Sequence, residues 1–414
     1  MGYEWVGFLI VLLSGLFLIM GPIATFFPRK VAQLLGAGMV MRGFGSLIRY
    51  TVIYQLYGHG DAEQYFKAGL YYSDLIWQYD FSFFHGPLWG GNWWGTQMVM
   101  FISGFVIALI GPTQKGEFLF FAILSLIGLL LFAKAFQRNY PQSDLKGYLK
   151  WLLFWPSLWF WPSSVGKDAL MLLSTALLVY GYTAKKEGKI SWIILGMSFV
   201  LAAVIRPHVA GVMVVSLAIA HWLSPSRKWG SVHIWQGLLI LLLLALVLRQ
   251  GFSDLGLDQV DVESLRDYVD LQAKRSAEGG SAISAGGGTL TAIPIGVVNV
   301  LFRPFPWEAG SPLLAAASLE MVVFWAIFFK RRHRIFLVMK EWRSNRLLCL
   351  IVPLTILYVV MLGLAMGNLG IIARQRIHIL PMLFVWLEAR PMAVPVYESR
   401  RYMPPALTKK IATT

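Results

Sequence analysis

The feature that most constrains this chain is a series of apolar runs, most of them roughly 17 to 25 residues long. Repeated runs of this length are typical of helices that cross the hydrocarbon core of a bilayer. We therefore predict an all-α polytopic membrane protein, with residues 1–414 forming one domain. The expected spans, about eleven with several short, are residues 5–27, 34–56, 97–111, 117–133, 167–183, 190–205, 208–223, 233–249, 313–329, 347–366 and 376–389.

The composition supports the same class of protein. Only 14% of the residues are charged and 57% are hydrophobic, which leaves too little polar surface to cover a soluble globule. The net charge of +15 would suggest nucleic acid in a soluble chain, but the basic residues cluster between apolar runs. This favours cytoplasmic anchoring, so we expect no nucleic-acid partner. Residues 330–346 and the tail at 390–414 should face the cytoplasm, with the protein in the inner (plasma) membrane of a bacterium.

Several common chemistries have no motif in this sequence. The single cysteine, Cys349, excludes an intramolecular disulfide and a cysteine-based metal cage. There is no His-Glu-x-x-His, Gly-x-Ser-x-Gly or Walker motif. We predict no metal site and no required cofactor, although the sequence leaves room for a divalent metal. Residues 5–27 lack a basic n-region and a clear cleavage site, and we interpret them as a retained helix rather than a cleaved signal.

The topology depends on residues 151–164, which contain two prolines and four tryptophans. We interpret this short segment as re-entrant or interfacial, because tryptophan favours the headgroup level. Residues 57–96 then share the outer face with Lys167, Arg206, residues 250–312 and Arg374. If the segment crosses instead, Asp61 falls inside. Our interpretation has a cost, since it places four cations outside, against the positive-inside tendency: Lys134, Arg138, Lys146 and Lys150.

Two long outer segments remain. Residues 57–96 are rich in aromatic side chains and suit amphipathic helices that lie on the membrane surface. Residues 250–312 begin with an acidic stretch and continue into a glycine-rich run at residues 279–288. That run permits either a mobile lid over a site or a plain flexible connector.

Asp61 and Glu63 lie where the second span should meet water. A carboxylate beside apolar surface can serve as a general base toward a hydroxyl acceptor, so both are candidate catalytic residues. The alternative is structural, with Asp61 capping a helix and Glu63 in its first turn.

Further charged groups lie beside the ends of apolar runs. Lysine and arginine at such positions suit a phosphate, although anchoring and snorkelling to lipid headgroups explain several of them as well. Glu320, inside a span, could pair with a buried arginine such as Arg42 or Arg49. The candidate phosphate-binding residues are Lys167, Arg206, His208, Arg303, Arg374 and Arg376, with Arg49, Asp168, Glu308 and His378 in supporting roles.

Three motifs carry a resemblance to known proteins. Gly60-Asp-Ala-x-x-Tyr65 and Ala373-Arg-Gln-Arg-Ile-His-Ile-Leu-Pro381 resemble the GT-C superfamily of membrane glycosyltransferases, which includes dolichyl-phosphate-mannose mannosyltransferases and bacterial aminoarabinose transferases. Pro162-Ser-Ser-Val-Gly-Lys-Asp168 is similar to a stretch in bacterial polysaccharide-locus membrane proteins.

The resemblance implies a GT-C-like fold and a division of roles. Asp61 would activate the acceptor, and Lys167, Arg206, Arg374 and Arg376 would hold the phosphate of a polyprenyl-phosphate-linked sugar. The expected activity is sugar transfer on the extracytoplasmic face, in cell-envelope glycan or polysaccharide assembly. This chain has an extra N-terminal span and Asp-x-Glu where the family has adjacent acids, so the acceptor stays open among glycan, lipid and protein.

Two other functions fit the same residues. A lipid-linked oligosaccharide polymerase or ligase shares the donor type and the outer cations, and would not need the Asp61 carboxylate. A transporter or flippase for an anionic lipid-linked glycan would use the cations only for binding. Inverted repeats with interrupted helices would favour the transporter, but the sequence has one clear proline-broken element and no matching half.

Overall fold

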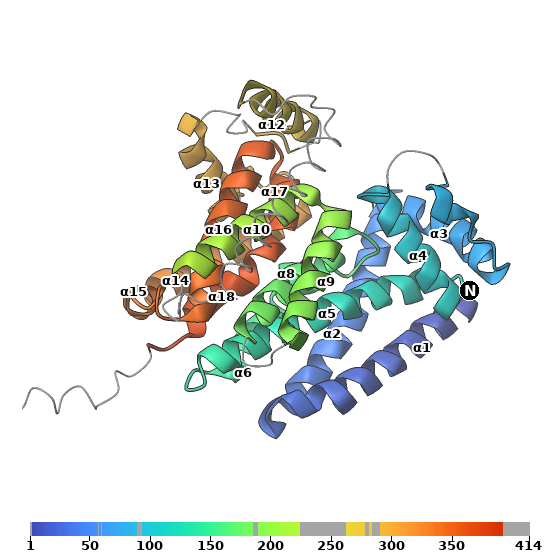
Figure 1. Ribbon diagram of the computed structural model, residues 1–414, viewed down its shortest axis with the longest axis horizontal. Coiled ribbons are helices and arrows are strands. Elements are labelled where there is room, and N and C mark those ends of the chain that lie inside the picture. The colour runs from blue at the N-terminus through green and yellow to red at the C-terminus, as the bar shows by residue number, and fades with distance from the viewer. Residues whose placement is uncertain are drawn as a thin grey trace, which may run out of the picture.

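The computed structural model describes residues 2–56, 58, 60–88, 93–184, 189–223, 262–277, 281–283 and 290–391 (Figure 1). Every regular element within these ranges is a helix, apart from one isolated bridge between Ala282 and Asn368. The α-helices are α1 (Gly2–Leu18), α2 (Ala32–Thr51), α3 (Asp61–Trp77), α4 (Thr96–Ile110), α5 (Gln114–Asn139), α6 (Leu145–Phe154), α7 (Pro156–Phe160), α8 (Lys167–Thr183), α9 (Lys189–Ile205), α10 (Pro207–Leu223), α12 (Val262–Ala277), α13 (Ile293–Leu301), α14 (Pro312–Lys330), α15 (Arg332–Met339), α16 (Arg346–Ala365), α17 (Leu369–Gln375) and α18 (Leu380–Glu388).

Five continuous helical stretches are long and apolar enough to cross a membrane, which fits the predicted class of protein. They are Gly2–Phe26, Arg29–Leu56, Gln114–Asn139, Pro312–Lys330 and Arg346–Ala365. Apolar helices at Thr96–Ile110, Ile190–Ile205 and Pro207–Leu223 are shorter. The predicted helices at 5–27, 34–56, 117–133, 167–183, 190–205, 208–223, 313–329 and 347–366 therefore form, and the one at 233–249 lies outside the described residues.

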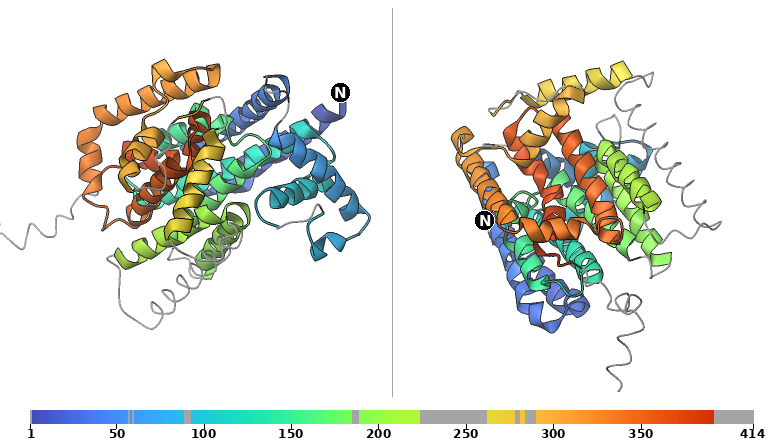
Figure 2. Two further views of the ribbon diagram at one scale, coloured as in Figure 1. Left: turned by 90° about the horizontal axis from the view of Figure 1, so that it is seen from above. Right: turned by 90° about the vertical axis from the view of Figure 1, so that its left-hand side faces the viewer.

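Long helices pack along one another in a bundle, with α5 near its centre (Figures 1 and 2). In α5, 72% of the most apolar window is buried, against 28% in the stretch that contains α1. Large apolar side chains on α1, such as Leu13 and Phe17, are exposed. An outer helix with an exposed apolar face suits contact with lipid chains.

Contacts between neighbouring helices define two ends of the bundle. α1 and α5 run in the same direction, because Gly7 lies beside Thr113 at the start of α5 and Gly15 lies beside Ile123 further along it. α5 and α8 are also parallel, because Gly128 lies beside Leu173 and Arg138 donates a hydrogen bond to Tyr180. α9 runs the opposite way: Ser174 and Ser198 are hydrogen-bonded to each other's carbonyls at 2.9 Å, and Ser191, near the start of α9, donates to the carbonyl of Ala184 at the end of α8. We call the end where α8 begins the Lys167 end. The opposite end, where α14 finishes, is the Arg331 end.

α6 and α7 form one interrupted path along α2. Leu153 of α6 lies beside Gly38, and Trp159 of α7 lies beside Gly45. The two short helices therefore lead from the Arg331 end toward the Lys167 end, parallel to α2, and do not turn back. Pro156 begins α7, and Glu320 of α14 accepts a hydrogen bond from the Ser157 backbone N–H at 2.6 Å. Glu320 thus caps α7, whereas the sequence suggested an arginine partner.

The predicted helix at 97–111 forms as α4, but both of its ends lie at the Lys167 end. Gly95, just before it, donates a hydrogen bond to the carbonyl of Val204 at 2.7 Å, near the end of α9. Gly111, just after it, lies beside Tyr3 at the start of α1. α4 packs along α3 as an antiparallel hairpin at this end of the molecule (Figure 1).

These two differences correct the placement of the basic residues. Asn345, at the start of α16, donates to the carbonyl of Asn139 at 3.4 Å, and Lys150 lines the same cavity as Arg331. The cations at 134, 138, 146 and 150 therefore lie at the Arg331 end with residues 330–346, and their placement on the opposite face was wrong. The interrupted path of α6 and α7 returns the chain to the Lys167 end. α4, in contrast, does not lead from one end of the bundle to the other.

The outer segments are partly described. Residues 57–96 contain α3 and a short 3-10 helix at Ser82–His85, so they are not an extended loop. Most of the glycine-rich run at 279–288, and residues 250–261, lie outside the described residues. The predicted last span is divided into a 3-10 turn, Arg376–His378, and α18.

A close backbone contact joins α13 to α16 at the Lys167 end. A Cβ added to Gly363 would lie 2.5 Å from the carbonyl carbon of Gly296. Only two glycines allow the helices to approach this closely, as small residues do in membrane helix pairs. The contact holds α13, and with it Arg303, against the helix that precedes α17.

Candidate functional site

The centre of the candidate site is Asp168, in the first turn of α8. Its side chain is 4% exposed and forms ion pairs with Arg206 and Arg374. Arg206 Nη2 donates to one carboxylate oxygen at 3.1 Å, and Arg374 Nε donates to the other. Since the three residues come from α8, the turn between α9 and α10, and α17, a single buried carboxylate joins three separate parts of the chain.

Arg206 is further held by α16 and α17. Its Nη1 donates to Gln375 Oε1, which also accepts a hydrogen bond from the Tyr358 hydroxyl at 3.2 Å. Both terminal nitrogens of Arg206 are therefore engaged, and its side chain is only 12% exposed. Arg206 acts mainly as a support for Asp168 and Gln375.

Lys167 and Arg374 have unused hydrogen-bonding capacity. Lys167 Nζ donates to Thr96 Oγ1 at 3.1 Å, and no ion pair of Lys167 occurs among the described residues. Arg374 uses only Nε, is 33% exposed, and its two terminal nitrogens make no hydrogen bond in the described part of the chain. These are the two cations of the site that can receive an external anion.

Asp61 and Glu63, the predicted catalytic pair, differ in their surroundings. Glu63 forms an ion pair with Lys67 of its own helix at 2.7 Å. Asp61, the first residue of α3, is exposed and forms no ion pair or hydrogen bond among the described residues. Its charge acts on both Lys167 and Arg374. A carboxylate that has no partner in the described part of the chain therefore acts electrostatically on the two cations that have open donors.

Tyr65 stands one turn after Asp61, on a buried part of α3. Burial raises the pKa of Tyr65 to about 12, and the Asp61 charge adds to the rise. The hydroxyl therefore stays protonated at neutral pH. It can donate a hydrogen bond to an anion, but it cannot serve as the base.

Two predicted phosphate ligands, Arg303 and Arg376, form a separate structural group with the supporting residue Glu308. Arg303 Nε donates to both oxygens of Glu308, at 2.8 and 3.0 Å. Arg376 is buried, and its guanidinium donates to the backbone carbonyls of Val300 and Arg303. Glu308 and Arg376 thus fix the turn after α13. Arg376 has the environment of a structural arginine, and we no longer count it among the ligands.

The other predicted residues lie around the cluster. The charges of Arg206 and Lys167 act on His208, in the first turn of α10. His378 is buried with its ring 5.8 Å from that of Tyr358, and its ring nitrogens make no hydrogen bond among the described residues. Arg49 lies over the rings of Phe160 and Trp161, at 5.0 and 4.9 Å, which is a cation–π arrangement.

A cavity of about 560 Å³ adjoins α17 on the side of Arg303. Trp161, Asn368 and Ala373 line it, together with the Arg303–Glu308 pair. It therefore reaches the residue that precedes Arg374. An aromatic wall with amide and charged groups suits a polar ligand of moderate size.

Within the described residues, no group of three or more His, Cys, Asp or Glu side chains could hold a metal ion. No protein-family model, curated protein or solved structure matches this chain. The chemistry of the site must then be inferred from its own residues. They provide a carboxylate without a partner, a protonated tyrosine, two cations with open donors and a rigid ionic support.

Sequence reasoning missed four polar members of this site, namely Tyr65, Thr96, Tyr358 and Gln375. Tyr65 and Gln375 lie inside the two motifs already singled out, and their positions beside charged residues were the available signal. Tyr358 lies inside an apolar run with no polar neighbour in sequence. Only the packing of α16 against the Arg206 turn reveals its role.

Proposed function

We propose that this chain is a membrane glycosyltransferase that moves a sugar from a polyprenyl-phosphate-linked donor to an acceptor hydroxyl. The observation that carries the proposal is the exposed Asp61 carboxylate, which has no hydrogen-bond or ion-pair partner among the described residues and whose charge acts on Lys167 and Arg374. Transfer of a glycosyl group requires a base for the acceptor and cations for the leaving phosphate, and both are available at one end of the bundle.

Each residue has a stated role in this reaction. Asp61 accepts the proton of the acceptor hydroxyl, whose oxygen then forms a bond to the sugar C1. The bond from C1 to the phosphate oxygen breaks, and the polyprenyl phosphate leaves with the electron pair. Lys167 and the terminal nitrogens of Arg374 stabilise the charge that grows on this phosphate. Asp168 and Arg206 keep Arg374 in position.

The distribution of basic residues supports an orientation in the membrane. The Arg331 end carries residues 330–346 and the cations at 134, 138, 146 and 150. By the positive-inside tendency this end faces the cytoplasm, so the candidate site faces the extracytoplasmic side. Because α6 and α7 lead back to the Lys167 end, the cations at 134, 138, 146 and 150 no longer have to be placed outside, against that tendency. A bacterial inner membrane and a role in envelope glycan assembly remain part of the proposal.

A lipid-linked polymerase or ligase is the second candidate. It is favoured by the pairing of Asp168 with two arginines, which leaves Asp61 as the one carboxylate without a partner among the described residues of the site. In such an enzyme the cations alone would drive the reaction by holding the lipid phosphate. Substitution of Asp61 by asparagine would then leave turnover intact.

The test uses the full-length protein in proteoliposomes with a panel of radiolabelled polyprenyl-phosphate sugars. We expect label to pass from at least one donor to a hydroxyl acceptor, with release of polyprenyl phosphate. Movement of the labelled lipid from one leaflet to the other, with no transfer from any donor, would overturn the proposal in favour of a transporter. Protein-free liposomes and the Arg374→Gln variant provide the controls.

A further inference from the structure

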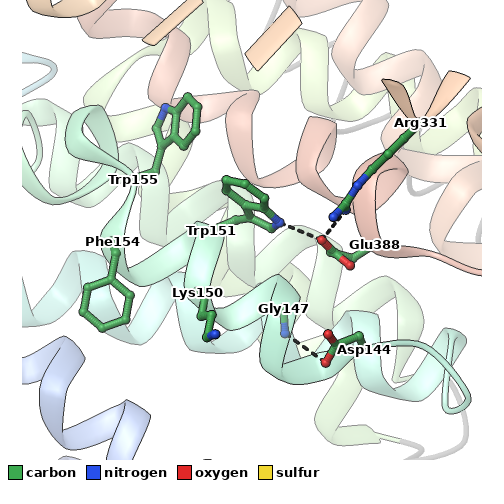
Figure 3. A pocket seen from close by; sticks show the side chains of 8 residues that line it. All are labelled: Asp144, Gly147, Lys150, Trp151, Phe154, Trp155, Arg331 and Glu388. Carbon is green, nitrogen blue, oxygen red and sulfur yellow. Dashed lines mark hydrogen bonds and ion pairs between the residues drawn. The ribbon is translucent and has the colours of Figure 1, made fainter. Parts of the chain in front are cut away.

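A second cavity opens at the Arg331 end, at the opposite end of the bundle from the candidate site. Its volume is about 530 Å³, and it lies between α6 and the last residues of α14 and α18. Figure 3 shows Arg331, Glu388 and Asp144 on one side of it, and Phe154 and Trp155 on the other. The walls are therefore charged on one side and aromatic on the other.

The charged and the aromatic side of the cavity lie at opposite ends of α6. Asp144 caps the helix at the Arg331 end, and Phe154 is its last residue. With a rise of 1.5 Å per residue, these positions are separated by about 15 Å along the helix axis. A ligand that contacts both has a polar end at the end of the bundle and an apolar end directed toward its middle. This is the shape of a lipid that stands in a bilayer.

The two carboxylates of the cavity differ in their partners. Glu388 Oε1 accepts hydrogen bonds from Trp151 Nε1, at 2.7 Å, and from Arg331. One oxygen of the exposed Asp144 accepts from the backbone N–H of Gly147 at 3.0 Å and caps α6, and its other oxygen makes no hydrogen bond among the described residues. Glu388 is therefore engaged by the protein, and the Asp144 charge is offset in part by the start of its helix.

The cations of the cavity retain donors. Arg331 directs Nη1 to Glu388 and to the carbonyl of Leu387, while its Nε and Nη2 make no hydrogen bond among the described residues. Lys150 is exposed and makes none in the described part of the chain. Arg334 does not line the cavity but lies 4.0 Å from Glu388. With Arg334 included, three cations face the carboxylates of Asp144 and Glu388, an excess of one positive charge that favours an anion.

We propose that this cavity binds a phospholipid with an anionic headgroup. The headgroup phosphate lies between Lys150 and Arg331, and an acyl chain follows the exposed ring of Phe154. Anionic lipids are concentrated in the cytoplasmic leaflet, which this end is proposed to face. The binding site itself does not depend on the proposed transfer reaction.

The test is native mass spectrometry of the full-length protein, titrated separately with phosphatidylglycerol, phosphatidylcholine and inorganic phosphate. Lys150→Gln is compared with Lys146→Gln, because Lys146 is equally exposed on α6 but does not line the cavity. Both positions are at the surface, so both variants should fold. Their elution as single peaks in detergent checks this.

We expect phosphatidylglycerol to bind more tightly than phosphatidylcholine, and its Kd to rise about fivefold in Lys150→Gln, as for the loss of one basic residue near an anionic surface. Lys146→Gln should bind like the wild type, and inorganic phosphate should not displace the lipid. Equal affinity for the two lipids would overturn the proposal. So would equal losses in both variants, or displacement by inorganic phosphate, which would indicate a site for the free anion.

Discussion

The buried ionic triad of Asp168, Arg206 and Arg374 makes a strong prediction about stability. In Asp168→Asn, both guanidinium groups lose their anion, and Arg206 is only 12% exposed. Removal of one partner from a buried ion pair costs about 3–5 kcal/mol, because the remaining charge is left uncompensated. We expect the free energy of unfolding to fall by an amount in this range.

The same contacts predict a smaller effect for Arg374→Gln. Asp168 keeps Arg206 in that variant, and the Arg374 side chain is 33% exposed, so the loss should be about 1–2 kcal/mol. The double variant Asp168→Asn with Arg206→Gln removes a buried charge together with its partner. It should be less damaging than the sum of the two single changes, because the buried charges of Asp168 and Arg206 are removed together and only the partly exposed Arg374 is left without its anion.

The assay is unfolding in mixed micelles by titration with sodium dodecyl sulfate, followed by tryptophan fluorescence. Glu63→Gln is the matched control, because it removes an ion pair at an exposed lysine and should cost less than about 1 kcal/mol. If Asp168→Asn lies within about 1 kcal/mol of the wild type, or if the double variant shows simple additivity, the triad is not the support we describe.

Three further predictions concern binding, pH and packing. Lys167→Gln and Arg374→Gln should each weaken donor binding about 10- to 100-fold, the value of a charge-assisted hydrogen bond, as measured by Kd for a non-transferable polyprenyl phosphate; unchanged affinity would remove them from the phosphate site. The hydrogen bond from Arg303 lowers the pKa of Glu308, so the pair stabilises the fold above the unfolded pKa of about 4.3 and loses this effect as the pH falls through the lower folded pKa. The difference in melting temperature between wild type and Glu308→Gln should then be constant from about pH 7 to 5, begin to shrink near about pH 4 and disappear once the pH is below the folded pKa of Glu308; a difference that is undiminished in strong acid would contradict this. Gly363→Val should cost about 1–3 kcal/mol or more in the same unfolding assay, since its side chain would clash with Gly296, whereas Gly196→Ala, inside α9 with open space around it, should be neutral or stabilise the fold by up to about 1 kcal/mol.

The sequence predicted helices well where apolar runs are long and unbroken. α5 and α16 are examples, because their length and composition leave no other regular structure. The sequence was less informative for α4. Its apolar run has the composition of a span, but the start and the finish of the helix both lie at the Lys167 end of the bundle. Length and hydropathy do not say where the ends of a helix lie, and this depends on the packing of α4 against α3.

The path of α6 and α7 was misjudged for a related reason. Each helix is too short to cross a bilayer alone, and the break at Pro156 separates them in any sliding window. Glu320, from a helix far along the chain, satisfies the backbone at that break. A proline-broken path that is stabilised in this way cannot be distinguished from a re-entrant segment without the neighbouring helix.

The sequence indicated several residues of the candidate site but not their contacts. Charged groups beside apolar runs pointed to Asp61, Lys167, Arg206 and Arg374, which the structure brings to one end of the bundle. The sequence did not indicate that Asp168 pairs with two arginines, because its partners are 38 and 206 residues away. Likewise, the spacing of Asp61 and Glu63 did not show which carboxylate would be paired. The i,i+4 position of Lys67 relative to Glu63 was the available signal.

The most direct test of the proposed function compares Asp61→Asn with Glu63→Gln in single-turnover sugar transfer, at donor concentrations that saturate binding. The account predicts that Asp61→Asn lowers the transfer rate by about 10²–10⁴-fold with donor affinity retained, as for the loss of a general base. Glu63→Gln, whose carboxylate is engaged by Lys67, should retain nearly the full rate. Full activity in Asp61→Asn, or equal losses in both variants, would contradict the role of Asp61 as the catalytic base.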